Sequence, residues 1–343
     1  MSRTSHVLSD YGFAEDANPS FRSDMEDGHT HVDPCGPTQN MAFLGIYDGH
    51  GGRDTVTYIQ RHLHERFLFI LQRDTWRSAA QAGVEAFRVT DSETASKNCL
   101  YDGCTAIVVI VEKKQTETGL IYHITSLNCG DARAVLVRNG VGRRISCDHK
   151  PGLPSESDRI RSAGGFVAGG RVNGLLSVSR SFGDHAMKKL IICDPFVSET
   201  TIDPSAPPPA PSSPLPQVKT QPKQASFAGG LRGTPKGGRK IQAGKKPSED
   251  ETNEMEMAPQ TPLSPKGSGS GGPQVSETVV SQSMGDVFVI LACDGVWDVI
   301  GDDEAAEIIK PYGDNCRKAA DVLVKAALEK GTMDNVSVIV ARL

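Results

Sequence analysis

The sequence predicts an α+β fold in which antiparallel sheets pack together and amphipathic helices cover them from outside. One observation is a set of short runs rich in β-branched residues, which are typical of strands: 41–47, 104–111, 120–127, 133–138, 287–293 and 336–342. A second is the Asn139-Gly140 turn, which marks a hairpin and so an antiparallel sheet. A third is helical spacing of apolar residues in several longer segments, which must bury an apolar face against a sheet.

The predicted elements alternate in groups along the chain. The strand 41–47 is followed by helices at 54–72 and about 75–97. Three strands and the hairpin come next, and a short helix is predicted at 155–165. The strand 287–293 and the final strand 336–342 enclose a helix at 315–331, for which Gly331 is a suitable C-terminal residue.

Composition excludes several classes of protein. The chain has 343 residues and a formal net charge of −5, which argues against nucleic acid as the main partner. Its apolar runs are shorter than the roughly 18 residues needed to span a bilayer. The start, MSRTSHVLSDYGF, has no apolar signal core, and Ser2 replaces the glycine needed for myristoylation. The eight cysteines form no Cys-x-x-Cys pair, which argues against structural zinc and favours a reducing, cytoplasmic location.

Residues of about 204–275 differ from the rest of the chain. They are rich in Pro, Gly, Ser and Lys and have almost no large apolar side chains, a composition that predicts a disordered insert. Because both flanks contain predicted elements, we expect a single domain over 1–343 that this insert interrupts. The flanks PFVSETTI (195–202) and PQVSETVV (273–280) are near copies, and either could supply the same edge strand.

Carboxylates collect where predicted strands begin or end. Asp48 and Asp294 follow apolar strands, Asp334 precedes the last strand, and Asp131 lies at a hairpin tip. Each acid alone could be a plain turn residue, but four such acids should meet at one rim and repel each other unless a cation lies among them. Only oxygen ligands are available, so the sequence predicts Mg²⁺ or Mn²⁺, and two ions about 3.5–4 Å apart would suit shared acids.

Eight motifs, in order and over most of the chain outside the insert, give the sequence a family resemblance. They are RSDMED (22–27), YDGHGG (47–52), DGCTA (102–106), NCGDARAV (128–135), DHKP (148–151), RVNGLLSVSRSFGD (171–184), LACDGVWDV (291–299) and DNVSVIV (334–340). The chain resembles the metal-dependent Ser/Thr protein phosphatases of the PP2C type. The resemblance implies a four-layer α-β-β-α sandwich, two antiparallel sheets between pairs of helices.

The resemblance also implies a mechanism. Two Mg²⁺ or Mn²⁺ ions would share a water that attacks the phosphate of phosphoserine or phosphothreonine in line, without a phospho-enzyme. The implied metal site comprises Asp48, the Gly49 carbonyl, Asp294, Asp334, Glu26 and Asp27. Arg22 would clamp the phosphate, because a guanidinium matches two phosphate oxygens, unless it forms a surface ion pair with Asp24 or Glu26. His50 would protonate the leaving oxygen, since the pKa of imidazole lies near neutrality.

Further implied features are less central to the chemistry. Asp131 and Asp298 match positions that hold a third, weaker metal in some family members. Residues of about 155–185 correspond to the family's flap, where Arg180 would either touch the substrate peptide or form a structural ion pair. The chain departs from the family pattern at Cys104 and Ala132, where serine is usual, and neither position carries a ligand or an acid–base group.

The insert and the partners leave alternatives open. Ser213-Pro214, Thr261-Pro262 and Ser264-Pro265, with basic residues at 236–246, fit proline-directed phosphorylation, a nuclear address or an inert linker. We expect phosphoprotein substrates and a monomer. Two other functions compete with the phosphatase: a non-catalytic scaffold, which should have lost its metal acids, and a two-metal hydrolase of small phosphate esters.

Overall fold

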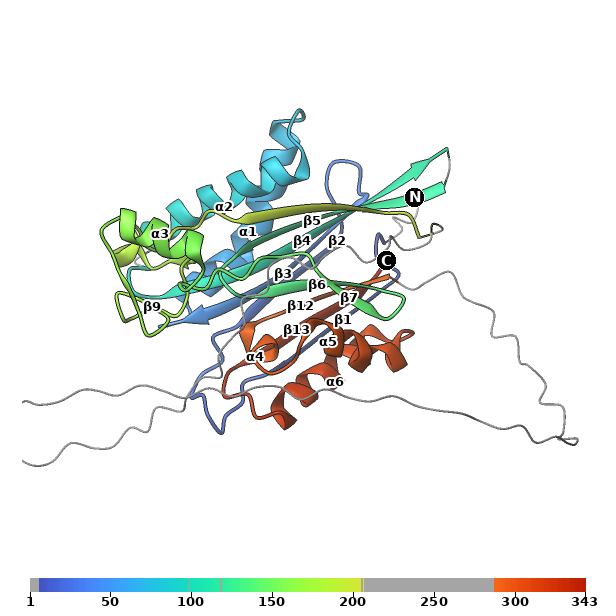
Figure 1. The fold of residues 1–343 in the computed structure, drawn as a ribbon. Helices are drawn as coiled ribbons and strands as arrows, with labels where there is room; N and C mark the ends of the chain where they lie inside the picture. The colour runs from blue at the N-terminus through green and yellow to red at the C-terminus, as the bar shows by residue number, and fades with distance from the viewer. Residues whose placement is uncertain (1–5, 98, 118, 205, 207–286) are drawn as a thin grey trace, which may run out of the picture. The chain divides into compact units, whose positions relative to one another are not determined.

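Two antiparallel sheets, with helices on their outer faces, form the body of the protein (Figure 1). The computed structural model describes residues 6–97, 99–117, 119–204, 206 and 287–343. The predicted α+β sandwich is confirmed. The predicted insert lies outside the described residues, apart from 204 and 206.

The first sheet has the order β11-β5-β4-β3-β2, with the short β10 added beside β4. All of its neighbouring strands are antiparallel. Its strands are β2 (Gly28–Cys35), β3 (Met41–His50), β4 (Gly103–Thr116), β5 (Gly119–Cys129), β10 (Phe182–Gly183) and β11 (Phe196–Ile202). The edge strand β11 is the first of the two near copies, and the second copy lies outside the described residues.

The second sheet has the order β1-β13-β12-β6-β7, again with antiparallel neighbours. Its strands are β1 (Asp10–Asp16), β6 (Arg133–Arg138), β7 (Val141–Arg144), β12 (Val287–Ala292) and β13 (Val336–Arg342). The turn between β6 and β7 is the predicted Asn139-Gly140 hairpin, and both residues have the positive φ that such a turn requires.

Each central strand is apolar on both faces because it lies between two cores. In β3, Leu44 and Ile46 point into the core between the sheets, whereas Phe43 and Tyr47 point into the core beneath the helices. Alternate residues of a strand face opposite ways. A strand buried on both sides therefore has an unbroken run of apolar residues in the sequence. These strands could be predicted because of that run.

Helices complete the outer two layers. The first sheet is covered by α1 (Asp54–Arg73) and α2 (Ala79–Ala95), and the second by α4 (Asp294–Trp297), α5 (Asp302–Ile309) and α6 (Cys316–Glu329). Helix α1 buries Ile59, Leu63 and Phe67, which share one helical face. Helix α2 begins later than predicted because Ser78 and Gln81 form a capping box there.

A small subdomain, which we call the flap, corresponds to residues 154–194. It contains α3 (Pro154–Ser162), the two-stranded pair β8 (Val167–Ala168) and β9 (Arg171–Val172), and the 3-10 turn η1 (His185–Met187). Outside the flap, a second 3-10 turn, η2 (Lys310–Tyr312), follows α5. The flap has its own small apolar cluster of Ile160, Val172 and Ile191.

Two further properties bear on the sequence predictions. Within the described part of the chain, no helix is long and apolar enough to cross a membrane. All eight cysteines are free, and all but Cys147 are buried.

The strands β1 and β2 and the helices α4 and α5 were not predicted.

Glu156 anchors the flap. Its carboxylate, on a residue that is 2% exposed, accepts hydrogen bonds from Arg180 Nη2 (2.5 Å), Arg159 Nη2 (2.8 Å) and Ser179 Oγ (2.8 Å). Burial alone would raise the pKa of Glu156, but the hydrogen bonds from Arg180 and Arg159 outweigh burial and lower the pKa to about 2.

We expect Glu156→Gln to destabilise the protein by on the order of 3 kcal/mol at neutral pH. Because the folded-state pKa is depressed below the ordinary value of 4.5, the stabilisation is present above about pH 4.5 and is lost as the pH falls towards 2. Urea unfolding of both proteins between pH 7 and 3 measures this. Asp158→Asn, on the exposed face of the same helix, is the matched control, and a pH-independent difference would contradict the prediction.

Candidate metal centre and active site

Strand register brings the candidate acids to one rim of the two sheets. In the second sheet, Ala292 pairs with Arg133 on one side and with Val338 on the other. Asp131 lies two residues before Arg133 and Asp294 two residues after Ala292, so both leave the sheet at the same end. Asp334 precedes β13 at that end as well. Asp48 reaches the rim from the first sheet, near the end of β3.

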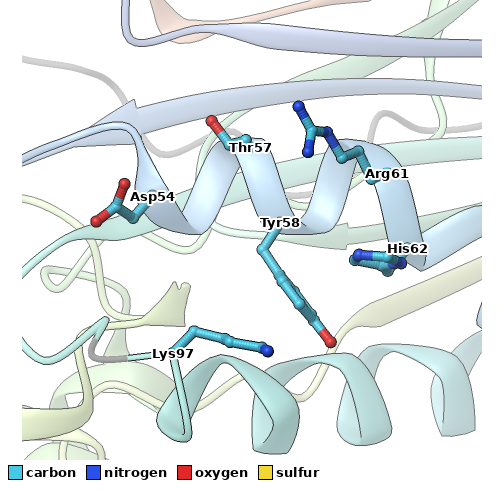
Figure 2. Close-up of a pocket in the computed structure, with 6 residues that line it drawn as sticks. All are labelled: Asp54, Thr57, Tyr58, Arg61, His62 and Lys97. Carbon is cyan, nitrogen blue, oxygen red and sulfur yellow. The ribbon is translucent and has the colours of Figure 1, made fainter.

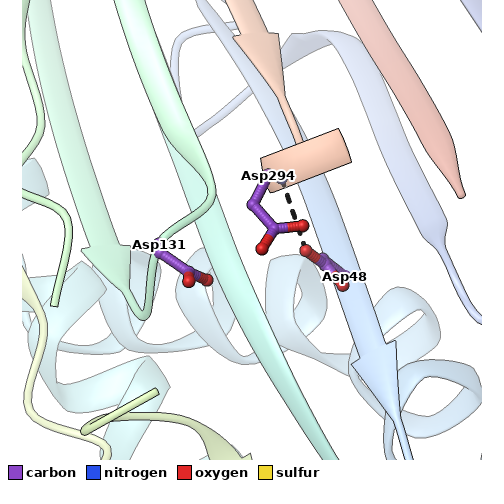
Figure 3. A group of neighbouring side chains, drawn as sticks. All are labelled: Asp48, Asp131 and Asp294. Carbon is purple, nitrogen blue, oxygen red and sulfur yellow. Dashed lines mark hydrogen bonds between the residues drawn. The ribbon is translucent and has the colours of Figure 1, made fainter. Parts of the chain in front are cut away.

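Three of these carboxylates form a tight group. Asp48, Asp131 and Asp294 each offer one carboxylate oxygen, and the three oxygens lie within 4.8 Å of one another. Figure 3 shows the side chains converging from β3, from the turn before β6 and from the start of α4. The backbone N–H of Asp294 also points to Asp48 Oδ2, at 3.5 Å. The group contains Asp131, one of the two predicted third-metal residues, and does not contain Asp334.

The electrostatics of this group favour a bound cation. Burial, followed by the charges of Asp294 and Asp27, raises the pKa of Asp48 well above its ordinary value. Burial and the charge of Asp131 raise the pKa of Asp294 to about 8. Charged carboxylates so close together repel each other, and a divalent cation would remove the repulsion.

A fourth acid supports the fit to a hard cation. Asp27 is 2% exposed, and its Oδ2 has no hydrogen-bond partner among the described residues. Burial raises its pKa to about 7. A buried oxygen without a partner is costly, and carboxylate oxygens are the ligands that Mg²⁺ and Mn²⁺ prefer. The donor set therefore fits the predicted ions.

Glycines allow the surrounding backbone to come close. A Cβ on Gly49 would lie 2.5 Å from the carbonyl oxygen of Glu26 and 2.6 Å from the Val56 side chain. The side chain of Glu26 in turn accepts a hydrogen bond from the Gly52 N–H at 2.7 Å. The segment that carries Glu26 and the end of β3 are thus held against each other.

Lys150 was not singled out from the sequence, although it lies in the DHKP motif. Its ammonium group donates a hydrogen bond to Asp131 Oδ2 and lies 3.7 Å from Asp294 Oδ2 and 4.0 Å from Asp298 Oδ1. Burial lowers the pKa of Lys150, but the neighbouring charges of Asp131 and Asp294 outweigh it and raise the pKa. The chain thus supplies one positive charge to the acidic group, beside both predicted third-metal residues.

We expect Lys150→Met to destabilise the metal-free protein by about 3 kcal/mol, because it removes the cation from a largely buried ion pair. Added Mn²⁺ should then raise the unfolding midpoint of the variant more than that of the original protein. Calorimetry in EDTA and in Mn²⁺ measures both effects. Lys325→Met, which removes an exposed ion pair on α6, is the control, and equal midpoints for the Lys150 variant and the original protein in EDTA would refute the prediction.

Arg22 lies beside the acidic group, and two nitrogens of its guanidinium donate hydrogen bonds there. Its Nη2 donates to Asp334 Oδ2 and its Nε donates to the Met333 carbonyl at 3.2 Å. Arg22 thus forms an ion pair with Asp334, and not with Asp24 or Glu26 as the alternative predicted. A guanidinium has five N–H donors, so these two contacts leave donors for a further anion.

His50, at the end of β3, is held by a residue that the sequence reasoning did not assign. Its Nε2 lies 2.8 Å from Oδ2 of Asp184, which is 3% exposed. Burial lowers the pKa of His50, but the hydrogen bond and the charge of Asp184 outweigh it and raise the pKa. Asp184 closes the motif RVNGLLSVSRSFGD, so the motif was the available signal.

Arg180 forms the structural ion pair that was the alternative to a substrate contact. Besides the Glu156 contacts, its Nη1 donates to the Asp194 carbonyl at 2.7 Å. The two departures from the family pattern, Cys104 and Ala132, are both fully buried in apolar cores.

A separate cavity lies between the exposed face of α1 and the end of α2 (Figure 2). Its volume is about 310 Å³, and its lining residues are Asp54, Thr57, Tyr58, Arg61, His62 and Lys97. It contains no group of carboxylates. The candidate chemistry therefore lies at the rim and not in this cavity.

Similarity to known proteins agrees with this geometry. The family model described as Protein phosphatase 2C matches residues 11–206 and 254–336. Protein phosphatase 2C homolog 1 of Saccharomyces cerevisiae is 29% identical over 341 residues, which cover 97% of this chain and 92% of the relative. Protein phosphatase 2C homolog 1 of Schizosaccharomyces pombe is 28% identical over 334 residues, which cover 97% of this chain and 72% of the relative. A crystal structure of serine-threonine phosphatase 2C from Toxoplasma gondii matches with a TM-score of 0.64 and 18% identity. The match covers 98% of this chain and 96% of that structure's chain.

Proposed function

The chain belongs to the protein phosphatase 2C family, and from that membership and the carboxylate group we propose that it is a Mg²⁺- or Mn²⁺-dependent hydrolase of phosphoserine and phosphothreonine in proteins. The observation that carries the proposal is the convergence of Asp48, Asp131 and Asp294 within 4.8 Å. The raised pKa values of Asp48 and Asp294 make the group unfavourable without a cation and suited to one.

The residues that would hold two ions are Asp48, the Gly49 carbonyl, Asp294 and Asp334, with Glu26 and Asp27 behind them. Asp131 and Asp298 would hold a third, weaker ion, where Lys150 now lies. When bound, the ions would supply a water of lowered pKa as the nucleophile and offset the charge of the phosphate.

The other groups act on the substrate itself. Arg22 would bind two phosphate oxygens through its remaining N–H donors and orient the phosphorus for in-line attack. His50 would donate a proton to the departing serine or threonine oxygen, which is a poor leaving group as an alkoxide. With the nucleophile supplied by water, no covalent intermediate on the protein is required.

The test is phosphate release by the purified full chain. The substrates are a phosphothreonine peptide and a nucleoside monophosphate, each with Mn²⁺, Mg²⁺ or EDTA. We expect metal-dependent release from the peptide that EDTA abolishes, and release from the nucleotide that is at least about tenfold slower. Faster release from the nucleotide would favour a small-ester hydrolase. Folded protein that is inactive with either metal would favour the scaffold.

A further inference from the structure

The imidazole of His50 is held at one nitrogen by a buried carboxylate from the flap. We propose that Asp184 is the positioning residue for His50, fixing which ring nitrogen and which ring orientation meet the leaving oxygen of the substrate. The proposal deepens the phosphatase function and rests on it. The contact joins Nε2 and Oδ2 at 2.8 Å, and Asp184 is 3% exposed.

The fold holds the Asp184 carboxylate from several directions. Strand β10 pairs with the start of β4, Gly183 opposite Gly103, which fixes the chain just before Asp184. The Asp184 N–H donates to the Asp102 carbonyl at 2.9 Å, and Ser181 Oγ donates to the same Oδ2 that meets His50. Asp184 also has a φ of +50°, a left-handed conformation that is uncommon for residues other than glycine. Such a conformation persists only where its surroundings impose it.

Gly103 provides an independent indication that the contact is built into the structure. A Cβ placed on Gly103 would overlap both Asp184 Oδ2 and His50 Nε2. The two side chains can therefore meet only because residue 103 has no side chain. Gly103 has no positive φ that would otherwise require glycine.

The contact determines how the proton would move. With Nε2–H donated to Asp184, Nδ1 is the ring nitrogen left for the substrate. As the P–O bond breaks, the Nδ1–H proton would pass to the serine or threonine oxygen, which leaves as a neutral alcohol. The neutral ring keeps its Nε2–H bond to Asp184 and recovers a proton at Nδ1 from solvent.

The experiment compares two leaving groups in the full chain with Mn²⁺. A phosphothreonine peptide needs a proton donor, whereas para-nitrophenyl phosphate releases a stable phenolate and does not. We expect Asp184→Ala to lower kcat on the peptide by about 100-fold and on para-nitrophenyl phosphate by less than about threefold. Asp184→Asn should recover part of the loss, because its amide oxygen can still accept the Nε2–H. The control is Asp194→Ala, an exposed acid in the same segment.

Two more variants separate positioning from a general structural role. Gly103→Ala, which leaves both side chains in the chain but forces them apart, should give the same selective loss on the peptide. In a His50→Ala background, Asp184→Ala should cause no further loss, because a residue that acts through His50 has nothing left to act on. Should Asp184→Ala fail to fold, Asp184→Asn in the two backgrounds gives the same comparison.

The outcomes distinguish this proposal from the one on which it rests. Equal losses on both substrates, or a further loss in the His50→Ala background, would overturn the positioning role while leaving the phosphatase intact. An original protein that is inactive on both substrates would overturn the proposed function and this inference with it. A selective loss that vanishes without His50 would establish the role.

Discussion

Replacing Asp48 with asparagine is expected to lower metal-dependent phosphate release from a phosphothreonine peptide by on the order of a thousandfold and, at the same time, to make the metal-free protein more stable. The loss of activity follows from removing a carboxylate of the proposed ion site. The gain in stability follows from the raised pKa of Asp48. Such a group binds its proton more readily in the folded chain, so its ionisation destabilises the metal-free fold as the pH rises above 3.8.

Three measurements on one variant test this. They are the rate with Mn²⁺, the heat of Mn²⁺ binding, and the unfolding midpoint in EDTA at neutral pH. Asp321→Asn, which alters an exposed ion pair on α6, should change none of them. A variant with a tenth or more of the original activity, or with a lower midpoint in EDTA, would show that Asp48 is not part of a strained cation site.

Arg22→Lys should lower kcat/KM on the phosphothreonine peptide by roughly thirtyfold, equivalent to about 2 kcal/mol of lost transition-state binding. Lysine keeps the charge but cannot present two parallel N–H donors to two phosphate oxygens. It also cannot bond both Asp334 and the Met333 carbonyl with the guanidinium geometry seen in the structure.

Steady-state kinetics over a range of peptide concentrations measures the effect of Arg22→Lys. The matched control is Arg88→Lys on α2, where the arginine forms an exposed ion pair with Glu85. If Arg22→Lys kept kcat/KM within threefold of the original value, the phosphate would not be held by a two-pronged guanidinium contact.

The central strands could be predicted from sequence, whereas the edge strands β1 and β2 could not. Strands such as β3 and β12 lie between two apolar cores, so burial leaves an unbroken apolar run. The edge strands β1 and β2 carry half-exposed, polar residues, and part of what holds them is distant in sequence. Tyr11 stacks on His31 with ring centroids 3.7 Å apart, and Phe13 stacks on His29 at 3.5 Å. No local sequence pattern predicts such contacts.

The residues of the candidate site also fall into those that could be predicted from sequence and those that could not. Asp48 and Asp294 could be found because each follows an apolar strand, and strand ends meet at a rim. Lys150 and Asp184 carry no such signal, since each lies in an irregular segment and reaches its partner across a long sequence separation. That Asp131 joins the tight carboxylate group, and Asp334 instead meets Arg22, depends on side-chain placement that strand patterns do not specify.

The pairing of β1 with β13 has a consequence for how the protein is made. Asp10 lies opposite Arg342, so the second sheet closes only after residue 342 has left the ribosome. The first sheet uses residues 28–202 alone and can form earlier during synthesis. Contacts so distant in sequence form slowly. Because Asp294 also follows all strands of the first sheet in the sequence, the carboxylate group cannot be complete before residue 294 has been synthesised.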